Sequence, residues 1–359
     1  MADLLFLYTS IATLFGIYAI LALSFNLEYG YAGQANLGKV FFFSIGAYVA
    51  GVLVVHSVAA LTGYAGDLFS AQAANARLLY AAGNPAAILS LFVGALVLAG
   101  FVGAGFGILA SYPALRLRGD FLAIVLIAVG EAGRVFVRVY TPLAGGNIGI
   151  GGVPSPFVFL GDREARVAFS LLVLALAFLA FVFVSRLSNS PFGRLLKSVR
   201  DDELAASVLG KRAPWVKAQV LAVGSGLAAI AGVLWAFWFQ TVAADDFIPQ
   251  TTFLVVAMVL LGGSGNHRGV LVGAITMTLL DHFTRPSFYA ILGIQADLPF
   301  DINYLRYILI GLMIILILMF RPQGLFPERP VRTKALEVAR AASGQAHADP
   351  PAAQAPPPT

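Results

Sequence analysis

The sequence predicts an all-α membrane protein that crosses the bilayer several times. Of its 359 residues, 59% are hydrophobic and only 11% are charged, whereas soluble globular chains carry roughly 25% charged residues. Several continuous runs without a charged side chain reach the roughly 20 residues that a helix needs to cross a bilayer core. Because every backbone polar group must be satisfied inside the hydrocarbon, these runs predict transmembrane helices.

Nine segments are predicted to cross the membrane, and eight or ten fit the sequence nearly as well. Phe121–Val137 is a span interrupted by Glu131 and Arg134. Phe247–Leu261 and Gly269–Leu280 are short, and they form either two tilted helices or one broken, re-entrant unit. The other predicted spans are five charge-free runs and a last apolar segment: Leu4–Leu27, Val40–Gly66, Leu78–Leu115, Val167–Ser185, Ala218–Ala244 and Ile302–Phe320.

Loop charges predict an external N-terminus and a cytoplasmic C-terminus. In this orientation, 16 of the 23 Lys and Arg residues lie on the cytoplasmic side, and cytoplasmic loops carry an excess of these residues. The external loop with Asp245 and Asp246 has no basic residue, which agrees. The cytoplasmic set is Lys39, Arg116, Arg118, Arg268, Arg321, Arg329, Arg332, Lys334, Arg340 and the seven basic residues of 186–217. The external set is Arg77, Arg134, Arg138, Arg163, Arg166, Arg285 and Arg306.

The chain divides into a membrane domain, residues 1–326, and a cytoplasmic tail, residues 327–359, that is predicted to be disordered. The tail is dominated by Ala, Pro, Gly and Gln, so it has too few apolar side chains to form a core. The first three residues lack the positive charge of a cleaved signal peptide, so the first run is expected to stay as a helix. No cysteine is present, which excludes disulfides and thiol chemistry.

A polar segment between two spans, residues 186–217, is the strongest functional signal in the chain. Its centre reads Asp201-Asp202-Glu203-Leu204-Ala205-Ala206-Ser207-Val208-Leu209-Gly210. Asp201 or Asp202 can cap a short helix here, and Gly210 suits the left-handed residue that ends one. The two adjacent alanines give this helix a low profile that fits a groove in a partner. An ordinary amphipathic helix on the membrane surface is the alternative.

A glycine-rich block after the first span is predicted to bend the backbone. Gly30, Gly33 and Gly38 are interleaved with Gln34 and Asn36. Glycine permits bends and close backbone approach, and membrane transporters place broken helices where gates move or substrates bind. The block is therefore a candidate gate on a translocation path, and a short cytoplasmic turn between two spans is the alternative.

Three charged residues lie on one face of the predicted span at 121–137. Glu131, Arg134 and Arg138 are spaced i, i+3 and i+7. Ionisable side chains inside a membrane are costly and face protein or water. Glu131 is expected to pair with Arg134, either as a local structural ion pair or as part of a translocation path near the external end.

No motif for metal binding, nucleotide binding or catalysis occurs in the sequence. No His, Asp and Glu cluster has metal-ligand spacing, and no G-x-x-x-x-G-K-[ST] loop is present. The chain is therefore expected to be no enzyme, to carry no cofactor and to be unable to hydrolyse ATP alone. Because its basic residues lie in loops beside spans, nucleic acid is not an expected partner.

Three sequence blocks, in order over about residues 10–326, carry a family resemblance. They are Asn26–Lys39 with Phe41–Tyr48, Pro113–Ile124 followed by Gly130-Glu131, and Phe320–Phe326. Together they resemble the LivM branch of the branched-chain amino acid ABC permeases. Asn36 and Lys39 depart from the family pattern, in which Ser and His are common at these places.

The resemblance also gives the polar segment a role. ABC importer permeases carry a cytoplasmic coupling helix with the pattern Glu-Ala-Ala, three residues, then Gly. Ala205-Ala206 and Gly210 match this pattern, whereas Leu204 stands at the place of the Glu and Glu203 precedes it. The resemblance therefore implies ATPase coupling by Asp201, Asp202, Glu203, Ala205, Ala206 and Gly210.

The family implies a permease subunit of an ATP-driven importer in the cell membrane, surrounded by lipid. The implied partners are a second, LivH-like permease, two cytoplasmic ATPases that bind the ATP, and an extracytoplasmic substrate-binding protein. Leucine, isoleucine, valine or related small neutral amino acids are the expected substrates, and urea, short amides or sugars are the alternatives. A self-sufficient secondary carrier or channel is a rival from another class. It would need buried acids for energy coupling, and only Glu131 is expected to qualify.

Overall fold

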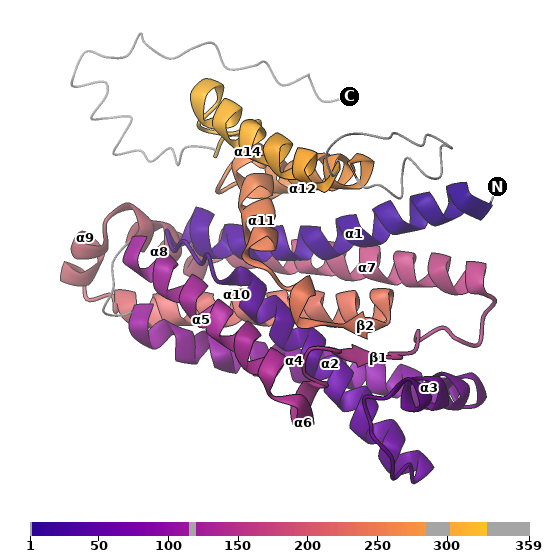
Figure 1. Cartoon of the computed structure of the whole chain (residues 1–359). Coiled ribbons are helices and arrows are strands. Elements are labelled where there is room, and N and C mark those ends of the chain that lie inside the picture. Colours follow the sequence, from indigo (N-terminus) through magenta and orange to yellow (C-terminus); the bar gives the residue numbers. More distant parts are fainter. Residues whose placement is uncertain (1, 115–119, 285–301, 329–359) are drawn as a thin grey trace, which may run out of the picture. The chain divides into compact units, whose positions relative to one another are not determined.

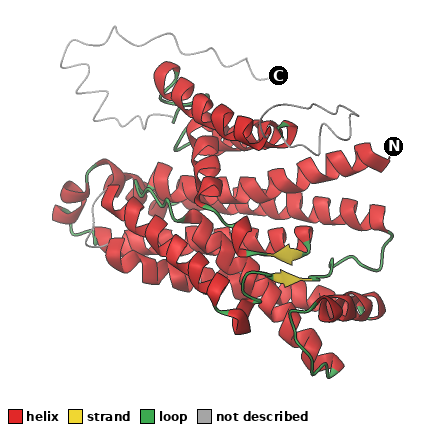
Figure 2. Ribbon diagram, viewed as in Figure 1, coloured by secondary structure: helices red, strands yellow, loops and turns green. Residues whose placement is uncertain are grey.

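Helices, most of them apolar, make up the larger part of the residues that the computed structural model describes, which are 2–114, 120–284 and 302–328 (Figure 2). Six helical segments in these ranges are long and apolar enough to cross a membrane, and Tyr307–Phe320 is a shorter apolar helix. The six are Leu5–Tyr31, Lys39–Thr62, Pro85–Tyr112, Asp162–Asn189, Ala213–Phe239 and Ala244–Gly262. The prediction of a polytopic helical membrane protein is confirmed, whereas the count of nine spans and the orientation stay predictions.

The first helices show how the glycine-rich block is built. Helix α1 (Ala2–Asn26) continues into a single π-helical turn, η1 (Leu27–Tyr31), and the chain then bends before α2 (Lys39–Thr62). Helix α2 ends at Gly63, whose φ of 66° is left-handed. The Ser70 side chain accepts a hydrogen bond from Ala73 N and so caps α3 (Ala71–Gly83), and α4 (Pro85–Ala114) follows.

The remaining elements alternate long apolar helices with short polar ones. Their bounds are α5 (Asp120–Val139), α6 (Thr141–Ala144), β1 (Ile150–Gly151), α7 (Asp162–Asn189), α8 (Pro191–Asp201), α9 (Glu203–Val208), α10 (Ala213–Phe239), β2 (Thr241–Val242), the 3₁₀-helix η2 (Ala244–Asp246), α11 (Pro249–Gly262), α12 (His267–Phe283) and α14 (Ile302–Phe320). Helix α5 carries several charged side chains, which is why it is not among the six apolar segments.

Helix α10 forms the centre of the helix packing, against α4, α2 and α1 (Figure 1). In its apolar window 78% of the residues are buried, compared with 28% in α4. Close approach is possible because Gly103 and Gly107 of α4 face the backbone of Ser225 and Leu221, and small residues let transmembrane helices pack closely. Helix α4 therefore presents its other face outward.

The two short apolar segments form two helices packed side by side, α11 and α12. Gly262 and Gly269 bring their backbones into contact, so neither position has room for a Cβ. The Asn266 side chain caps α12 by accepting hydrogen bonds from the backbone N–H groups of Arg268 and Gly269.

The two short strands pair antiparallel, with Ile150 opposite Val242 (Figure 2). Arg77 of α3 is buried beside them and donates hydrogen bonds to the backbone oxygens of Leu68 and Gly151, at 2.7 and 2.6 Å. The segment that connects the second and third long helices is thus tied to this small sheet.

Some predictions concern residues outside the described part of the chain. Arg116, Arg118 and Arg285 are among them, and so is residue range 329–359, which contains nearly all of the predicted tail. The side chain of Arg306 is likewise not described. The described residues up to Pro327 form one compact unit.

Candidate functional site

The polar segment forms two short helices, α8 and α9, with a break at Asp202. The Asp202 side chain accepts a hydrogen bond from Ala205 N at 2.9 Å, so it is the N-cap of α9. Asp201 instead pairs with Arg200 at 2.9 Å, and Glu203 pairs with Lys217 of α10 at 2.6 Å. Gly210 lies just past the helix with a left-handed φ of 77°, as predicted.

The two alanines of α9 do not share one environment, which corrects the expectation that both face a partner. Ala205 is exposed, but Ala206 is only 4% exposed and packs with Val216 and Val220 of α10. The outward face carries larger apolar side chains, because Leu204, Val208 and Leu209 are 76%, 80% and 78% exposed. Leu204 and Val208 are spaced i, i+4 and so lie on one helix face, and Leu209 follows as the C-cap of α9. The spacing of these apolar residues was visible in the sequence, but the sequence did not show which face of α9 packs against the rest of the protein.

The glycine-rich block bends inside the protein and is not a solvated turn. Of residues 27–39, only Gly33 is exposed, and its φ of 68° is left-handed. A Cβ at Gly30 would lie 2.5 Å from Gly265 N, so this glycine allows the bend to contact the loop between α11 and α12.

A fully buried ion pair closes this bend. Lys39 Nζ lies 2.8 Å from Glu28 Oε1, and the two side chains are 1% and 0% exposed. Gly224 of α10 lies against the Glu28 carboxylate, where a side chain would overlap Oε1. Glu28 therefore corrects the expectation that Glu131 is the one qualifying buried acid, and Lys39 is no loop charge.

Other buried polar atoms around this pair have no hydrogen-bond partner among the described residues. They include Glu28 Oε2 and both side-chain heteroatoms of Gln34. The Asn36 amide lies close to the Glu28 carboxylate but makes no hydrogen bond of normal geometry there. Buried polar groups usually find a partner, so these atoms can accept water or a polar solute within the bend.

The charged residues of α5 form a second, more exposed cluster. Arg134 Nη2 lies 2.7 Å from Glu131 Oε2, which confirms the predicted ion pair. Arg134 and Arg138 each reach Asp245 of η2 at 3.5 Å, a partner that spacing could not reveal. The cluster therefore joins α5 to the segment before α11.

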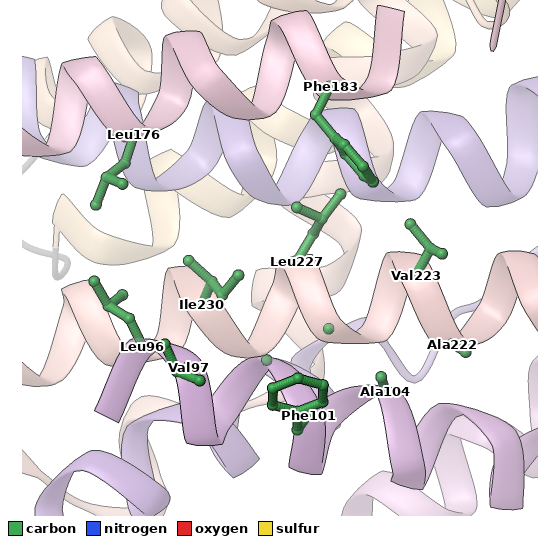
Figure 3. Close-up of a pocket in the computed structure, with 12 residues that line it drawn as sticks. Leu96, Val97, Phe101, Ala104, Leu176, Phe183, Ala222, Val223, Leu227 and Ile230 are labelled. Carbon is green, nitrogen blue, oxygen red and sulfur yellow. The ribbon is translucent and has the colours of Figure 1, made fainter. Parts of the chain in front are cut away.

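The described residues hold no group of three or more His, Asp and Glu side chains that could bind a metal ion. They do form apolar grooves. One of about 500 Å³ lies between α4, α7 and α10, lined by side chains such as Phe101, Phe183 and Leu227 (Figure 3). Leu176 and Phe183 of α7 lie opposite Leu227 and Ile230 of α10 in this view. Such a lining suits lipid hydrocarbon and offers no polar group for a solute.

These features define a class of protein: a multi-pass helical membrane protein with a buried polar bend and a short amphipathic helix pair outside its spans. A family model described as "Branched-chain amino acid transport system / permease component" matches residues 7–318. The chain therefore belongs to the permease family of branched-chain amino acid transport systems.

Individual relatives agree with this family. The probable branched-chain amino acid transport permease protein LivM of Methanocaldococcus jannaschii is 35% identical, over 89% of this chain and 93% of the relative. The high-affinity permease LivM of Escherichia coli K12 is 31% identical, over 88% of this chain and 69% of the relative. The corresponding LivH protein of Escherichia coli K12 is 27% identical, over 75% and 82%. No solved structure gives a significant match.

Proposed function

We propose that this chain is a membrane-spanning permease subunit of an ATP-driven ABC importer for branched-chain or related small neutral amino acids. The proposal rests on the family membership and on one structural observation. Helix α9 presents Leu204, Val208 and Leu209 to its surroundings while Ala206 anchors it to α10. An exposed apolar face on an anchored helix is suited to docking in the groove of a soluble partner.

In this proposal, α8 and α9 lie on the cytoplasmic side of the membrane. Nine spans with an external N-terminus place α8, α9 and Arg268 inside, and Asp245 with Arg134 and Arg138 outside. The contacts of Asp245 with both arginines support this, because residues assigned to the same side meet. Because Lys39 is buried, it no longer counts as a loop charge. The remaining Lys and Arg residues are still more numerous on the proposed cytoplasmic side.

The translocation path passes the buried bend. Gly30, Gly33 and Gly38 let the backbone turn there, and the buried side chains of Gln34 and Asn36 have polar atoms without a hydrogen-bond partner among the described residues. A zwitterionic solute needs polar groups of this kind when it leaves water. The Glu131–Arg134 pair belongs to the external end of the same path.

Other subunits supply what this chain lacks. A second, LivH-like permease completes the membrane domain, two cytoplasmic ATPases bind ATP, and an extracytoplasmic binding protein selects the substrate. Lipid covers the outward faces of α4 and α7. ATP binding closes the ATPases, moves α8 and α9, and switches the bundle between outward and inward openings. Binding measurements on the binding protein with a panel of solutes would identify the substrate.

The test is co-purification of the two ATPases with the pair of permease subunits. We expect Leu204→Ser with Val208→Ser to lower ATPase affinity by about tenfold or more, because burying one such side chain is worth about 1.5–3 kcal/mol. Ala205→Arg should weaken docking as well, whereas Ala206→Arg should also lower the stability of the isolated chain.

Ser198→Ala, at an exposed position on α8, is the matched control and should leave docking unchanged. Wild-type co-purification in the Leu204→Ser, Val208→Ser variant would mean that α9 is only a helix on the membrane surface.

A further inference from the structure

Helix α8 holds the π-helical turn η1 through two basic side chains. Arg200 donates a hydrogen bond from Nη1 to the backbone oxygen of Gly30. Its Cγ would lie 3.1 Å from a Cβ at Gly33, so the arginine also packs on the bend. One turn earlier on α8, Lys197 Nζ lies 5.1 Å from the ring centroid of Tyr31, a cation–π arrangement. Both contacts reach residues at the end of η1.

Helix α12 and the loop that precedes it also contact η1. The Tyr31 ring stacks on His267, with centroids 4.7 Å apart and planes 12° apart. At the start of the turn, Asn26 Oδ1 accepts a hydrogen bond from Gly265 N at 2.9 Å, and its Nδ2 lies 3.1 Å from His267 Nδ1. His267 Nε2 also bonds Ser188 Oγ of α7 at 2.8 Å. Both ends of η1 are therefore connected to other helices.

The buried ion pair begins inside this turn. Glu28 is the second residue of η1, and Lys39 is the first residue of α2. A π-helical turn holds one residue more than an α-helical one, and such turns occur frequently at functional sites. Converting it to α-helix shifts the following residues by one position, which is about 100° of rotation and 1.5 Å of rise. Such a shift would move Glu28 relative to Lys39.

We propose that η1 is the element through which α8 acts on the buried Glu28–Lys39 pair, with Arg200 as the positioning residue. Movement of α8 pulls on the Gly30 carbonyl and Tyr31, changes the winding of η1, and separates or re-forms the ion pair that closes the bend. The stack of Tyr31 on His267 transmits the same movement to α12. This inference rests on the proposed function, because it takes the ATPases to be the source of the movement.

The experiment uses the complete complex in proteoliposomes and measures leucine transported per ATP hydrolysed. We expect Arg200→Ala to lower this ratio by about tenfold or more, the factor equivalent to one charge-assisted hydrogen bond. The ATPases should co-purify as with the wild-type chain and continue to hydrolyse ATP. Arg200→Lys keeps the charge but not the planar fork, so an intermediate ratio is expected. Arg194→Ala, at an exposed position of the same helix, is the matched control. It should leave the ratio of leucine transported to ATP hydrolysed at the wild-type value.

Two results would overturn the inference. One is a wild-type ratio in both Arg200 variants. The other is a loss of ATPase co-purification in proportion to the loss of transport, which would make Arg200 a docking residue. Failure of the wild-type chain to bind the ATPases would instead refute the proposed function itself. The wild-type complex is therefore measured first, before any variant is compared.

Discussion

Two ion pairs in this chain lie in opposite surroundings. Glu28 and Lys39 are 11 residues apart, lie on either side of a bend, and are 0% and 1% exposed. Glu131 and Arg134 are neighbours on one helix face, and their side chains are 34% and 23% exposed. Their shortest distances, 2.8 and 2.7 Å, are nearly equal. Distance alone therefore does not distinguish the two pairs.

The two pairs differ in the free-energy cost of leaving one of their charges without its partner. Removing ions from water carries a large penalty, and a buried partner left unpaired keeps that penalty without compensation. A partly exposed pair is solvated and screened, so it contributes little to stability. Separating the buried pair therefore carries a large free-energy cost, whereas separating the exposed pair carries little.

The largest effect is expected when one member of the buried pair is removed. Glu28→Ala or Lys39→Ala should lower the free energy of unfolding by about 3–5 kcal/mol, because each leaves an uncompensated buried charge. Thermal unfolding of the purified chain in detergent measures this. The double variant Glu28→Gln, Lys39→Met should regain most of the stability. Single variants as stable as the wild type would show that the remaining charge is solvated and carries no desolvation penalty.

A smaller effect is expected from crowding the buried carboxylate. Gly224→Ala places a methyl group over Glu28 Oε1, and overpacking costs about 1–3 kcal/mol. Gly105→Ala is the matched control, because a Cβ there meets no atom within 4 Å. It should be neutral or slightly stabilising in the same unfolding measurement. Equal stability of the two variants would mean that Glu28 moves away from α10 without cost.

The smallest effect is expected at the exposed pair. Glu131→Gln should change the free energy of unfolding by at most about 1 kcal/mol, as for other partly exposed pairs. Arg134 keeps Asp245 as a partner at 3.5 Å, which limits the loss further. Unfolding at low and high salt checks this, since screening should remove the remaining difference. A loss of several kcal/mol would place this pair in the same category as Glu28–Lys39.

Local sequence patterns predicted the features that depend on neighbours along the chain. Charge-free runs predicted the long helices. Asp201 or Asp202 was predicted to begin a short helix that Gly210 ends, and the structure has Asp202 as the cap. The i, i+3 spacing of Glu131 and Arg134 predicted their ion pair. Each of these depends on helix periodicity or on capping within one turn, so no knowledge of the tertiary structure was needed.

The buried pair and the docking face could not be predicted in this way. Glu28 follows the first charge-free run and Lys39 precedes the second, so by position both resemble ordinary loop charges. The π-helical turn and the inward bend bring them together, and Gly224 of a distant helix makes room for the carboxylate. In α9, two identical neighbouring residues, Ala205 and Ala206, differ in exposure because only one faces α10.

The sequence by itself determined that this chain is a multi-pass helical membrane protein, because apolar length and backbone hydrogen bonding leave few other structures in lipid. It also determined where a polar helix interrupts the spans. Only the tertiary structure decided which charges are buried together and which face of α9 is free. Burial depends on what other segments pack against a residue, and contacts between residues distant in sequence are not encoded in any local pattern.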